Sequence, residues 1–303
     1  MTFRLNVVLL VLALFCGVPF WWFYLDGPFA GGHTAILGVP ALRVLAGSQP
    51  DGPIDISVTD VGAAVHSGNL HAAGSGIRRR ELDVLSFRLR YRDGRSVVIG
   101  TGMSRQTALA SGLRYYSDGK QKQVEGDIRA ATAILATGPG VFDLGGLAAM
   151  ATDPAAAPAL ARARLSQGQL PGPGAPADVP WPDGLVLRPA ITGKVPRPVL
   201  PGVVAIPADT VEAGNLLIYV RLASGREYVL AGPVAPFRVS ITERRARSRL
   251  LASEGPGFDR SAQMAWLAAL RRAERLYPGL AVIPGNDHAW IVDRNARTGI
   301  LSR

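Results

Sequence analysis

The sequence predicts an α+β domain built from two similar halves and preceded by an apolar N-terminal segment. Two observations indicate the domain class: strand patterns come in pairs followed by helical patterns, and this order then repeats along the chain. A third observation, the uncharged stretch Leu5–Leu25, separates the N-terminus from the domain. We therefore expect sheets packed against each other inside and helices on the outside.

In the first half, three segments alternate in the manner of half-buried strands. Ile54–Asp60 is the first, and Leu85–Tyr91 and Ser96–Ile99 form a hairpin across a short turn. A helix is predicted from about Ser104, and a second helical stretch lies near Val124–Ala131. This half therefore reads as strands followed by helices.

The stretch Ile134–Met150 predicts a buried strand, a tight turn and a helix. Thr137–Gly140 provides the turn, and the helix begins near Phe142. A strand that leads through a glycine turn into a helix is a common place for an active site. Here, however, Asp143 is the only carboxylate, and the stretch has no histidine, cysteine, lysine or glutamate.

The second half repeats the order. Pro154–Leu165 is alanine-rich and predicted to be helical, and residues 170–184 form either an irregular crossing between the halves or a simple surface loop. A strand over Pro201–Ile206 precedes the clearest hairpin of the chain, Asn215–Leu222 with Arg226–Ala231.

A long amphipathic helix and a short strand, Ala281–Ile283, complete this half. Asp259 or Ser261 caps the helix, and Pro278 ends it. Its predicted apolar face consists of Trp266, Ala269, Leu270, Ala273 and Tyr277.

Composition indicates a loop-rich globular protein. Charged residues make up 18% of the 303 residues, and there are 35 glycines and 23 prolines, which excludes a coiled coil or a disordered chain. The formal net charge is +10, almost all of it from arginine. This charge suits contact with anionic lipids or polyanions, and it fits a solvated surface equally well.

The N-terminus predicts a membrane anchor. Leu5–Leu25 is long enough to cross a bilayer, and Trp21–Tyr24 closes it like an interfacial aromatic belt. Arg4 precedes it and no basic residue follows until Arg43, so the positive-inside rule places the N-terminus in the cytoplasm and the domain on the outer, periplasmic face. A cleaved signal peptide and a secreted domain are the alternative. Residues 1–28 are thus an anchor or signal segment, and residues 29–303 are the exported domain.

The remaining histidines and basic clusters give little indication of a metal site or a nucleic-acid site. His33, His66 and His71 are expected in loops or at the surface, and no histidine matches a metal-ligand spacing. The basic clusters Arg78–Arg80 and Glu243–Arg249 have no interleaved aromatics, which favours a solvated or lipid-facing surface. We expect no nucleic-acid partner.

Several segments, in the same order, resemble motifs of the metallo-β-lactamase superfamily, the metallo-hydrolases of αββα sandwich fold. Val97–Met103 resembles the strand that ends in D-T-G, and Ile134–Leu147 resembles the segment that carries T-H-x-H-x-D-H-x-G-G-L. Pro201–Leu222 with Gly225–Ala235 resembles the G-H-T-P-G segment and the hairpin that ends in L-x-G-D. Val282–Asp287 resembles the late strand that ends in P-G-H-D. The resemblance implies a four-layer αββα sandwich.

The same alignment implies that every metal-ligand position of the family is substituted. Gly138 and Gly140 stand for the first two loop histidines, Phe142 for the aspartate, Asp143 for the next histidine, Val211 for the histidine of G-H-T-P-G, Pro233 for the bridging aspartate and Asn286 for the late histidine. Only Asp143 is still a carboxylate. A catalytic zinc needs three or more imidazole or carboxylate donors in a fixed geometry.

These substitutions favour a non-catalytic protein of this fold, a pseudoenzyme without a cofactor, that acts as a binding or scaffolding module. Its partner would be a protein or a small molecule. The alternative is a metallo-hydrolase with a relocated zinc site around Asp143, Asp287 and His288.

Overall fold

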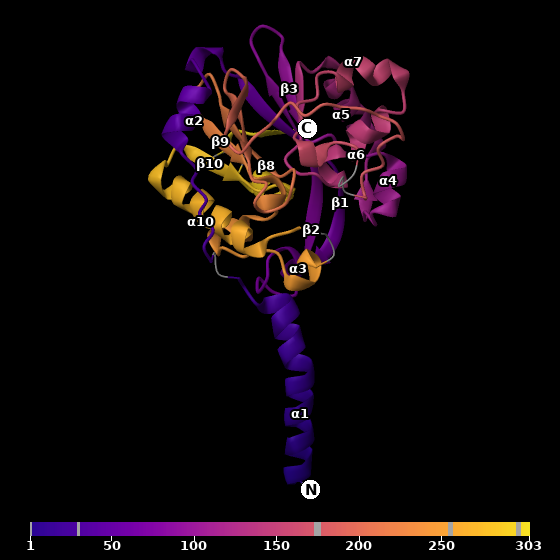
Figure 1. Cartoon of the computed structure of the whole chain (residues 1–303), viewed down its shortest axis with the longest axis vertical. Coiled ribbons are helices and arrows are strands. Elements are labelled where there is room, and N and C mark those ends of the chain that lie inside the picture. The colour runs from indigo at the N-terminus through magenta and orange to yellow at the C-terminus, as the bar shows by residue number, and fades with distance from the viewer. Residues whose placement is uncertain (1, 29–30, 173–176, 254–256, 295–297) are drawn as a thin grey trace.

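Two β-sheets pack face to face, and helices cover the outer face of each, which gives the four αββα layers predicted (Figure 1). The computed structural model describes residues 2–28, 31–172, 177–253, 257–294 and 298–303. One buried hydrophobic cluster joins side chains of both sheets, and one further cluster lies between each sheet and its helices. Burial of apolar surface on both sides of each sheet stabilises this arrangement.

The first sheet contains six strands in the order β11-β1-β2-β3-β5, with β4 paired to β1. They are β1 (Asp55–Ser67), β2 (Arg79–Arg90), β3 (Ser96–Ile99), β4 (Tyr115–Tyr116), β5 (Ala133–Leu135) and β11 (Leu301–Ser302). The strands β1 and β2 form a long antiparallel ribbon with a register shift between Asp60 and Gly62, and β5 lies parallel to β3.

The helical elements of residues 68–169 are α3 (Gly68–His71), α4 (Arg105–Ala110), α5 (Asp118–Ala130), α6 (Val141–Met150), the 3-10 turn η3 (Pro154–Ala156), α7 (Ala157–Leu160) and η4 (Gln167–Gln169). Of these, α4, α5, α6 and α7 pack against the first sheet. Ser104 and Ser117 cap α4 and α5 through their hydroxyl oxygens. Leu144 and Leu147 of α6 are fully buried against the sheet, so the strand–turn–helix predicted at 134–150 is confirmed.

The second sheet has five strands in the order β10-β9-β8-β7-β6. They are β6 (Arg197–Leu200), β7 (Val203–Pro207), β8 (Leu216–Arg221), β9 (Glu227–Leu230) and β10 (Leu280–Ile283). The predicted hairpin of β8 and β9 is confirmed, and β10 lies parallel to β9.

Helices within residues 39–45 and 238–276 cover the second sheet. The helical elements outside the first layer are α2 (Val39–Leu45), η2 (Gln49–Asp51), η5 (Gly232–Val234), α8 (Arg238–Thr242), α9 (Arg249–Ala252), α10 (Arg260–Leu276) and α11 (His288–Asp293). Asp259 caps α10, and Trp266, Leu270 and Ala273 are buried against the sheet as predicted.

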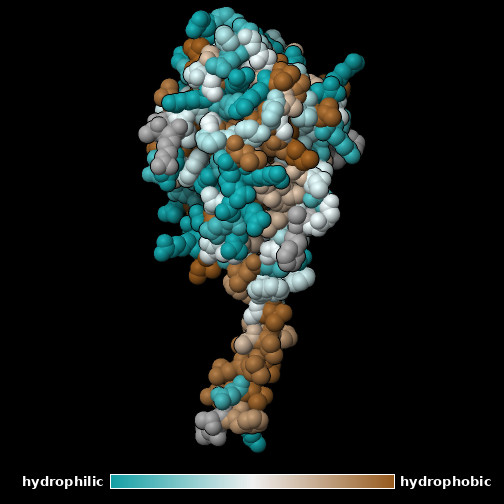
Figure 2. Space-filling view, turned by 90° about the vertical axis from the view of Figure 1, so that its left-hand side faces the viewer, coloured by the Kyte–Doolittle hydropathy of each residue, from teal (hydrophilic) through white to brown (hydrophobic). Residues whose placement is uncertain are grey.

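The N-terminal segment forms one apolar helix that projects from the domain. The helix α1 (Thr2–Phe20) continues into the π-helical turn η1 (Trp21–Leu25). Phe3–Leu25 is 23 residues long with a mean hydropathy of 2.2, which is long and apolar enough to cross a membrane. A signal sequence near the N-terminus meets the same criterion, so the length and composition of this segment fit a membrane anchor or a signal sequence. Figure 2 shows it as an apolar stalk below a mostly hydrophilic domain.

Some sequence predictions were incomplete or wrong. The segment before Pro53 contains α2, and β6 and α11 were not predicted. The helix expected over Pro154–Leu165 is only η3 and α7, because Pro158 and the bridge at Ala163 interrupt it. His71 was expected in a loop or at the surface, but it lies in α3 and is buried against Phe237 from the other half of the chain.

Candidate functional site

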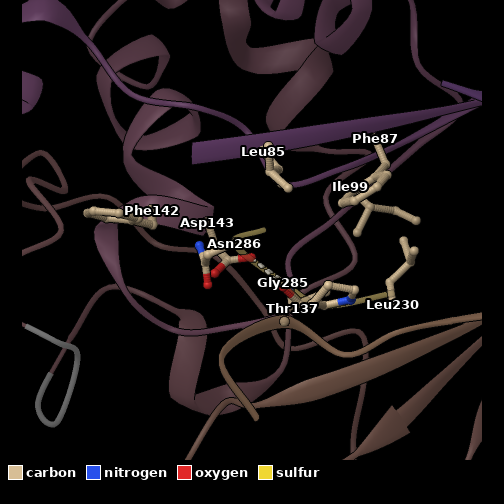
Figure 3. Close-up of a pocket in the computed structure, with 12 residues that line it drawn as sticks. Leu85, Phe87, Ile99, Thr137, Phe142, Asp143, Leu230, Gly285 and Asn286 are labelled. Carbon is tan, nitrogen blue, oxygen red and sulfur yellow. Dashed lines mark hydrogen bonds between the residues drawn. The ribbon is translucent and has the colours of Figure 1, made fainter. Parts of the chain in front are cut away.

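A small pocket lies where β5 runs into α6, at the place where the fold brings its loops together (Figure 3). The first sheet, the turn after β5, the end of β9 and the segment after β10 all contribute to it. Its lining residues are Leu85, Phe87, Ile99, Gly100, Thr137, Phe142, Asp143, Leu230, Gly232, Pro284, Gly285 and Asn286. The cavity measures about 10 Å³, which is room for about one water molecule.

Asp143 holds the turn after β5. Its Oδ1 accepts hydrogen bonds from the Thr137 backbone N–H at 3.0 Å and from the Thr137 hydroxyl at 2.6 Å. Burial raises the pKa of this carboxyl, and the two bonds from Thr137 act in the opposite direction. The main-chain oxygen of Asp143 accepts from Thr101 as well. Asp143 is therefore bonded as a structural support of the turn.

Pro233 occupies the space that a side chain at position 138 would need. A Cβ atom added to Gly138 would lie 2.4 Å from Pro233 Cγ and 2.9 Å from Asp143 Oδ2. Real Cβ atoms do not approach other atoms so closely, because the overlap is strongly repulsive. With Pro233 in place, position 138 therefore has no room for a side chain.

The two glycines of α6 bring the helix close to the preceding loop. A Cβ on Gly146 would lie 1.9 Å from the Thr101 carbonyl oxygen, and the Gly146 N–H donates to the Gly102 oxygen at 2.7 Å. A Cβ on Gly145 would lie 2.9 Å from Met103 Cβ. Both positions therefore require glycine for close backbone packing.

The structure brings together some of the predicted ligand positions and separates others. Phe142, Asp143 and Asn286 line the pocket, and Gly138 and Pro233 are in contact beside it. Gly140 instead precedes α6, where a Cβ would approach only Asp178 Oδ2, at 3.5 Å.

Val211 does not reach the pocket. It is fully buried in the cluster between the second sheet and its helices, and its carbonyl oxygen accepts from the Asp259 N–H at 2.7 Å. The predicted set is therefore split between the pocket and a separate part of the core.

The members of the relocated site are each engaged elsewhere. Asp287 Oδ1 accepts from the Trp290 N–H at the start of α11, and Oδ2 accepts from the Arg238 N–H at 2.9 Å. The ring of His288 lies 3.8 Å from Asp60 Oδ2 and 3.2 Å from the Ser302 hydroxyl. Burial lowers the pKa of His288. In the described part of the chain, no group of three or more His, Cys, Asp or Glu residues is placed to hold a metal ion.

Two buried carboxylates beside this histidine were missed at the sequence level. Asp60 and Asp83 are both 4% exposed, on the paired strands β1 and β2. Burial raises the pKa of Asp60 to about 6 and that of Asp83 to about 7. Asp83 Oδ2 accepts from the His288 N–H at 2.6 Å. Each aspartate stands within an apolar strand pattern, which is the one local signal of a buried charge.

Comparison with known proteins bears on the fold. No protein-family model matches the sequence, and no curated protein matches it. An N-acyl homoserine lactone hydrolase, solved with N-hexanoyl-L-homoserine at its catalytic metal center, is 12% identical, with a TM-score of 0.59 over 78% of this chain and 94% of that chain. A quorum-quenching N-acyl homoserine lactone lactonase is also 12% identical, with a TM-score of 0.59 over 78% and 92%. A probable metal-dependent hydrolase from Staphylococcus aureus is 14% identical, with a TM-score of 0.52 over 77% and 90%.

The layer order and these structural neighbours define the fold of the domain, an αββα sandwich. The chain has the metallo-β-lactamase fold, as the sequence resemblance predicted. At 12–14% identity the likeness extends to the fold alone.

The residues at this site do not fit the catalytic metal of that fold. A zinc site needs converging nitrogen, sulfur or oxygen donors at about 2.0–2.3 Å. Gly138 and Pro233 have no side-chain atom that could bind a metal, and the Pro233 ring occupies the space beside Gly138. The Asp143 carboxylate accepts a hydrogen bond from the Thr137 hydroxyl. The pocket residues therefore suit a closed, packed junction.

Proposed function

We propose that this protein is a non-catalytic member of the metallo-β-lactamase fold, a pseudoenzyme that acts as a binding or scaffolding module. The contact between Pro233 and Gly138 supports the proposal, because the sequence resemblance aligns both positions with metal ligands of the family and neither residue has a side-chain donor. The pocket of about 10 Å³ supports it, since a substrate needs far more room. The partner is a protein or a small molecule that uses the outer surface or the rim of the pocket.

The proposal includes the membrane. The segment Leu5–Leu25 would anchor the chain with its N-terminus in the cytoplasm and the domain on the outer, periplasmic face. Alkaline extraction of membranes tests the anchor: the chain should stay in the membrane pellet. Release into the soluble fraction would show a cleaved signal and a secreted domain.

Metal analysis of the full chain in detergent tests the lack of catalysis. After incubation with zinc, iron or manganese and removal of free ions, we expect metal far below one ion per chain. We also expect no hydrolysis of an acyl homoserine lactone or a chromogenic β-lactam above the buffer rate.

The alternative predicts a different pattern. A relocated hydrolase site would bind stoichiometric metal and lose it in Asp143→Asn and His288→Ala, but not in the matched control His33→Ala. His33 lies 3.1 Å from Asp259, at the start of α10. This pattern would replace the pseudoenzyme with the metal-dependent enzyme.

A further inference from the structure

Hydrogen bonds and ion pairs attach the end of the apolar N-terminal helix to the domain. Asp26, directly after η1, accepts a hydrogen bond from Arg249 Nε at 2.9 Å, and Arg260 Nη1 lies 3.7 Å from the same carboxylate oxygen. Arg260 also donates to the Asp26 main-chain oxygen. The guanidinium of Arg249 lies 3.8 Å above the ring of Trp22. These contacts fix the direction of the helix relative to the domain, and they lie at the end of the domain that carries Arg249 and Arg260.

Two arginine-rich segments that are far apart in sequence meet at this end. Ala73 donates to the Ala246 oxygen at 2.8 Å, and Ser248 donates to the Leu70 oxygen at 2.9 Å, which ties the loop after α3 to the segment before α9. A Cβ on Gly74 would lie 2.7 Å from Arg245 Nη1 and 3.4 Å from the Leu25 carbonyl oxygen. Figure 1 shows α3 beside the upper end of the helix.

The outer surface of this end is basic. We call Arg78, Arg79, Arg244 and Arg245 the arginine collar. In the described part of the chain, Arg78, Arg79 and Arg244 are exposed and have no carboxylate within ion-pair distance. Arg245 Nε lies 3.4 Å from Glu243 Oε2. A second acid, the exposed Glu81, follows Arg79 by two residues.

Apolar and aromatic groups accompany the charges. Ile77 is 74% exposed directly before the first two collar arginines, and Trp21 is 50% exposed at the end of the apolar helix. Exposed tryptophan at the end of an apolar span suits the headgroup level of a bilayer. Arginine forms paired hydrogen bonds to phosphate, and a basic surface next to a membrane span is attracted by anionic lipids.

We propose that the arginine collar binds the phosphate groups of anionic phospholipids, so that this end of the domain rests on the membrane that holds its helix. The inference goes beyond the proposed function and depends only on the helix being in a bilayer. The position of the two segments supports it: they are bonded to each other, and Gly74 lies next to Arg245 and to Leu25 at the end of the apolar helix. A docked domain presents its opposite end, with the β2–β3 turn, away from the lipid.

Arginine modification in nanodiscs tests the collar. The full chain is placed in nanodiscs of phosphatidylcholine alone or mixed with phosphatidylglycerol, treated with phenylglyoxal and analysed by peptide mass spectrometry. With phosphatidylglycerol, modification of Arg78, Arg79 and Arg244 should slow about fivefold or more. High ionic strength should reverse the effect.

Two arginines serve as internal controls. Arg92 is exposed two residues beyond the far end of the 12-residue strand β2, roughly 40 Å from the start of that strand. Arg272 is exposed on α10. Both should react at the same rate in the two lipids. Equal rates for the collar in the two lipids, or equal slowing of the controls, would overturn the proposal.

Charge reversal provides the matched variants. In Arg78→Glu combined with Arg79→Glu, the protection of Arg244 by phosphatidylglycerol should be lost. In Arg92→Glu combined with Arg272→Glu, it should remain. Protection that survives the first variant contradicts the collar, and so does a chain that fails to enter the nanodisc.

Discussion

Asp143 and Asp83 are both buried carboxylates beside the same pocket, but their surroundings differ. Asp143 accepts two hydrogen bonds from Thr137 and has no acidic neighbour among the causes of its pKa shift. Asp83 accepts one backbone N–H, from His288, and Asp60, Glu81 and Asp287 all raise its pKa. The comparison teaches that burial alone does not define a reactive acid, because the bonding partners decide whether a carboxylate is a fixed support or a proton-dependent group.

Truncation of the well-bonded carboxylate should have the largest effect. Asp143→Ala leaves the buried N–H and hydroxyl of Thr137 without their acceptor, so the free energy of unfolding should fall by about 2–4 kcal/mol. Thermal or denaturant unfolding of the full chain in detergent measures it. Asp143→Asn keeps an acceptor oxygen and should cost clearly less. Equal losses in the two variants would contradict the assigned role.

Asp83 should contribute to stability in a pH-dependent way. Its folded pKa, about 7, is raised above the ordinary value of 3.8, so its contribution is fully present below pH ~4 and is lost as the pH rises through 7. Asp83→Asn resembles the protonated form, and its stability relative to the wild type should therefore increase from pH 5 to pH 8, on the order of a few kcal/mol.

Unfolding curves of the two proteins across this range provide the measurement. Their difference is informative because His71 acts in the opposite direction: burial lowers its pKa to about 3, so its contribution grows as the pH rises toward 6.5. A difference that does not change with pH would show that Asp83 is ionised in the fold at all these values.

Close packing at the pocket should give a smaller, coupled effect. Gly138→Ala forces a Cβ against the ring of Pro233 and should lower the free energy of unfolding by about 1–3 kcal/mol. Pro233→Ala opens that space, so the double variant should lose less than the sum of the two single changes. Simple additivity would show that the two residues do not share the space.

Gly140→Ala should have the smallest effect of the series. Gly140 has an ordinary φ of −81°, and an added Cβ would meet only Asp178 Oδ2 at van der Waals distance. We expect less than about 1 kcal/mol by the same unfolding measurement. A loss as large as that of Gly138→Ala would mean that the whole turn, rather than the Pro233 contact, excludes side chains.

Local patterns predicted much of the fold. The hairpin of β8 and β9, the cap and apolar face of α10, and the strand–turn–helix at 134–150 follow from residue spacing over short windows. The short β6 and α2 were missed, because Arg197–Leu200 and Val39–Leu45 include prolines and owe their form to packing against distant segments.

The site was predicted only in part for the same reason. Motif order placed Phe142, Asp143 and Asn286 together, and these three residues line one pocket. It also placed Val211 there, whereas the chain buries Val211 under α10. The neighbours of His71 and the proximity of Asp60 to Asp83 depend on contacts between distant segments, and no short window contains them.

The strand β2 sets the distance between the arginine collar and the pocket. It begins with Arg79 in the collar, and six residues later Leu85 lines the pocket, a rise of roughly 20 Å along an extended strand. With the collar on the lipid, the rim of the pocket lies no more than roughly 20 Å above the headgroups. A rim at this height lies within reach of partners that are themselves held at the same membrane surface.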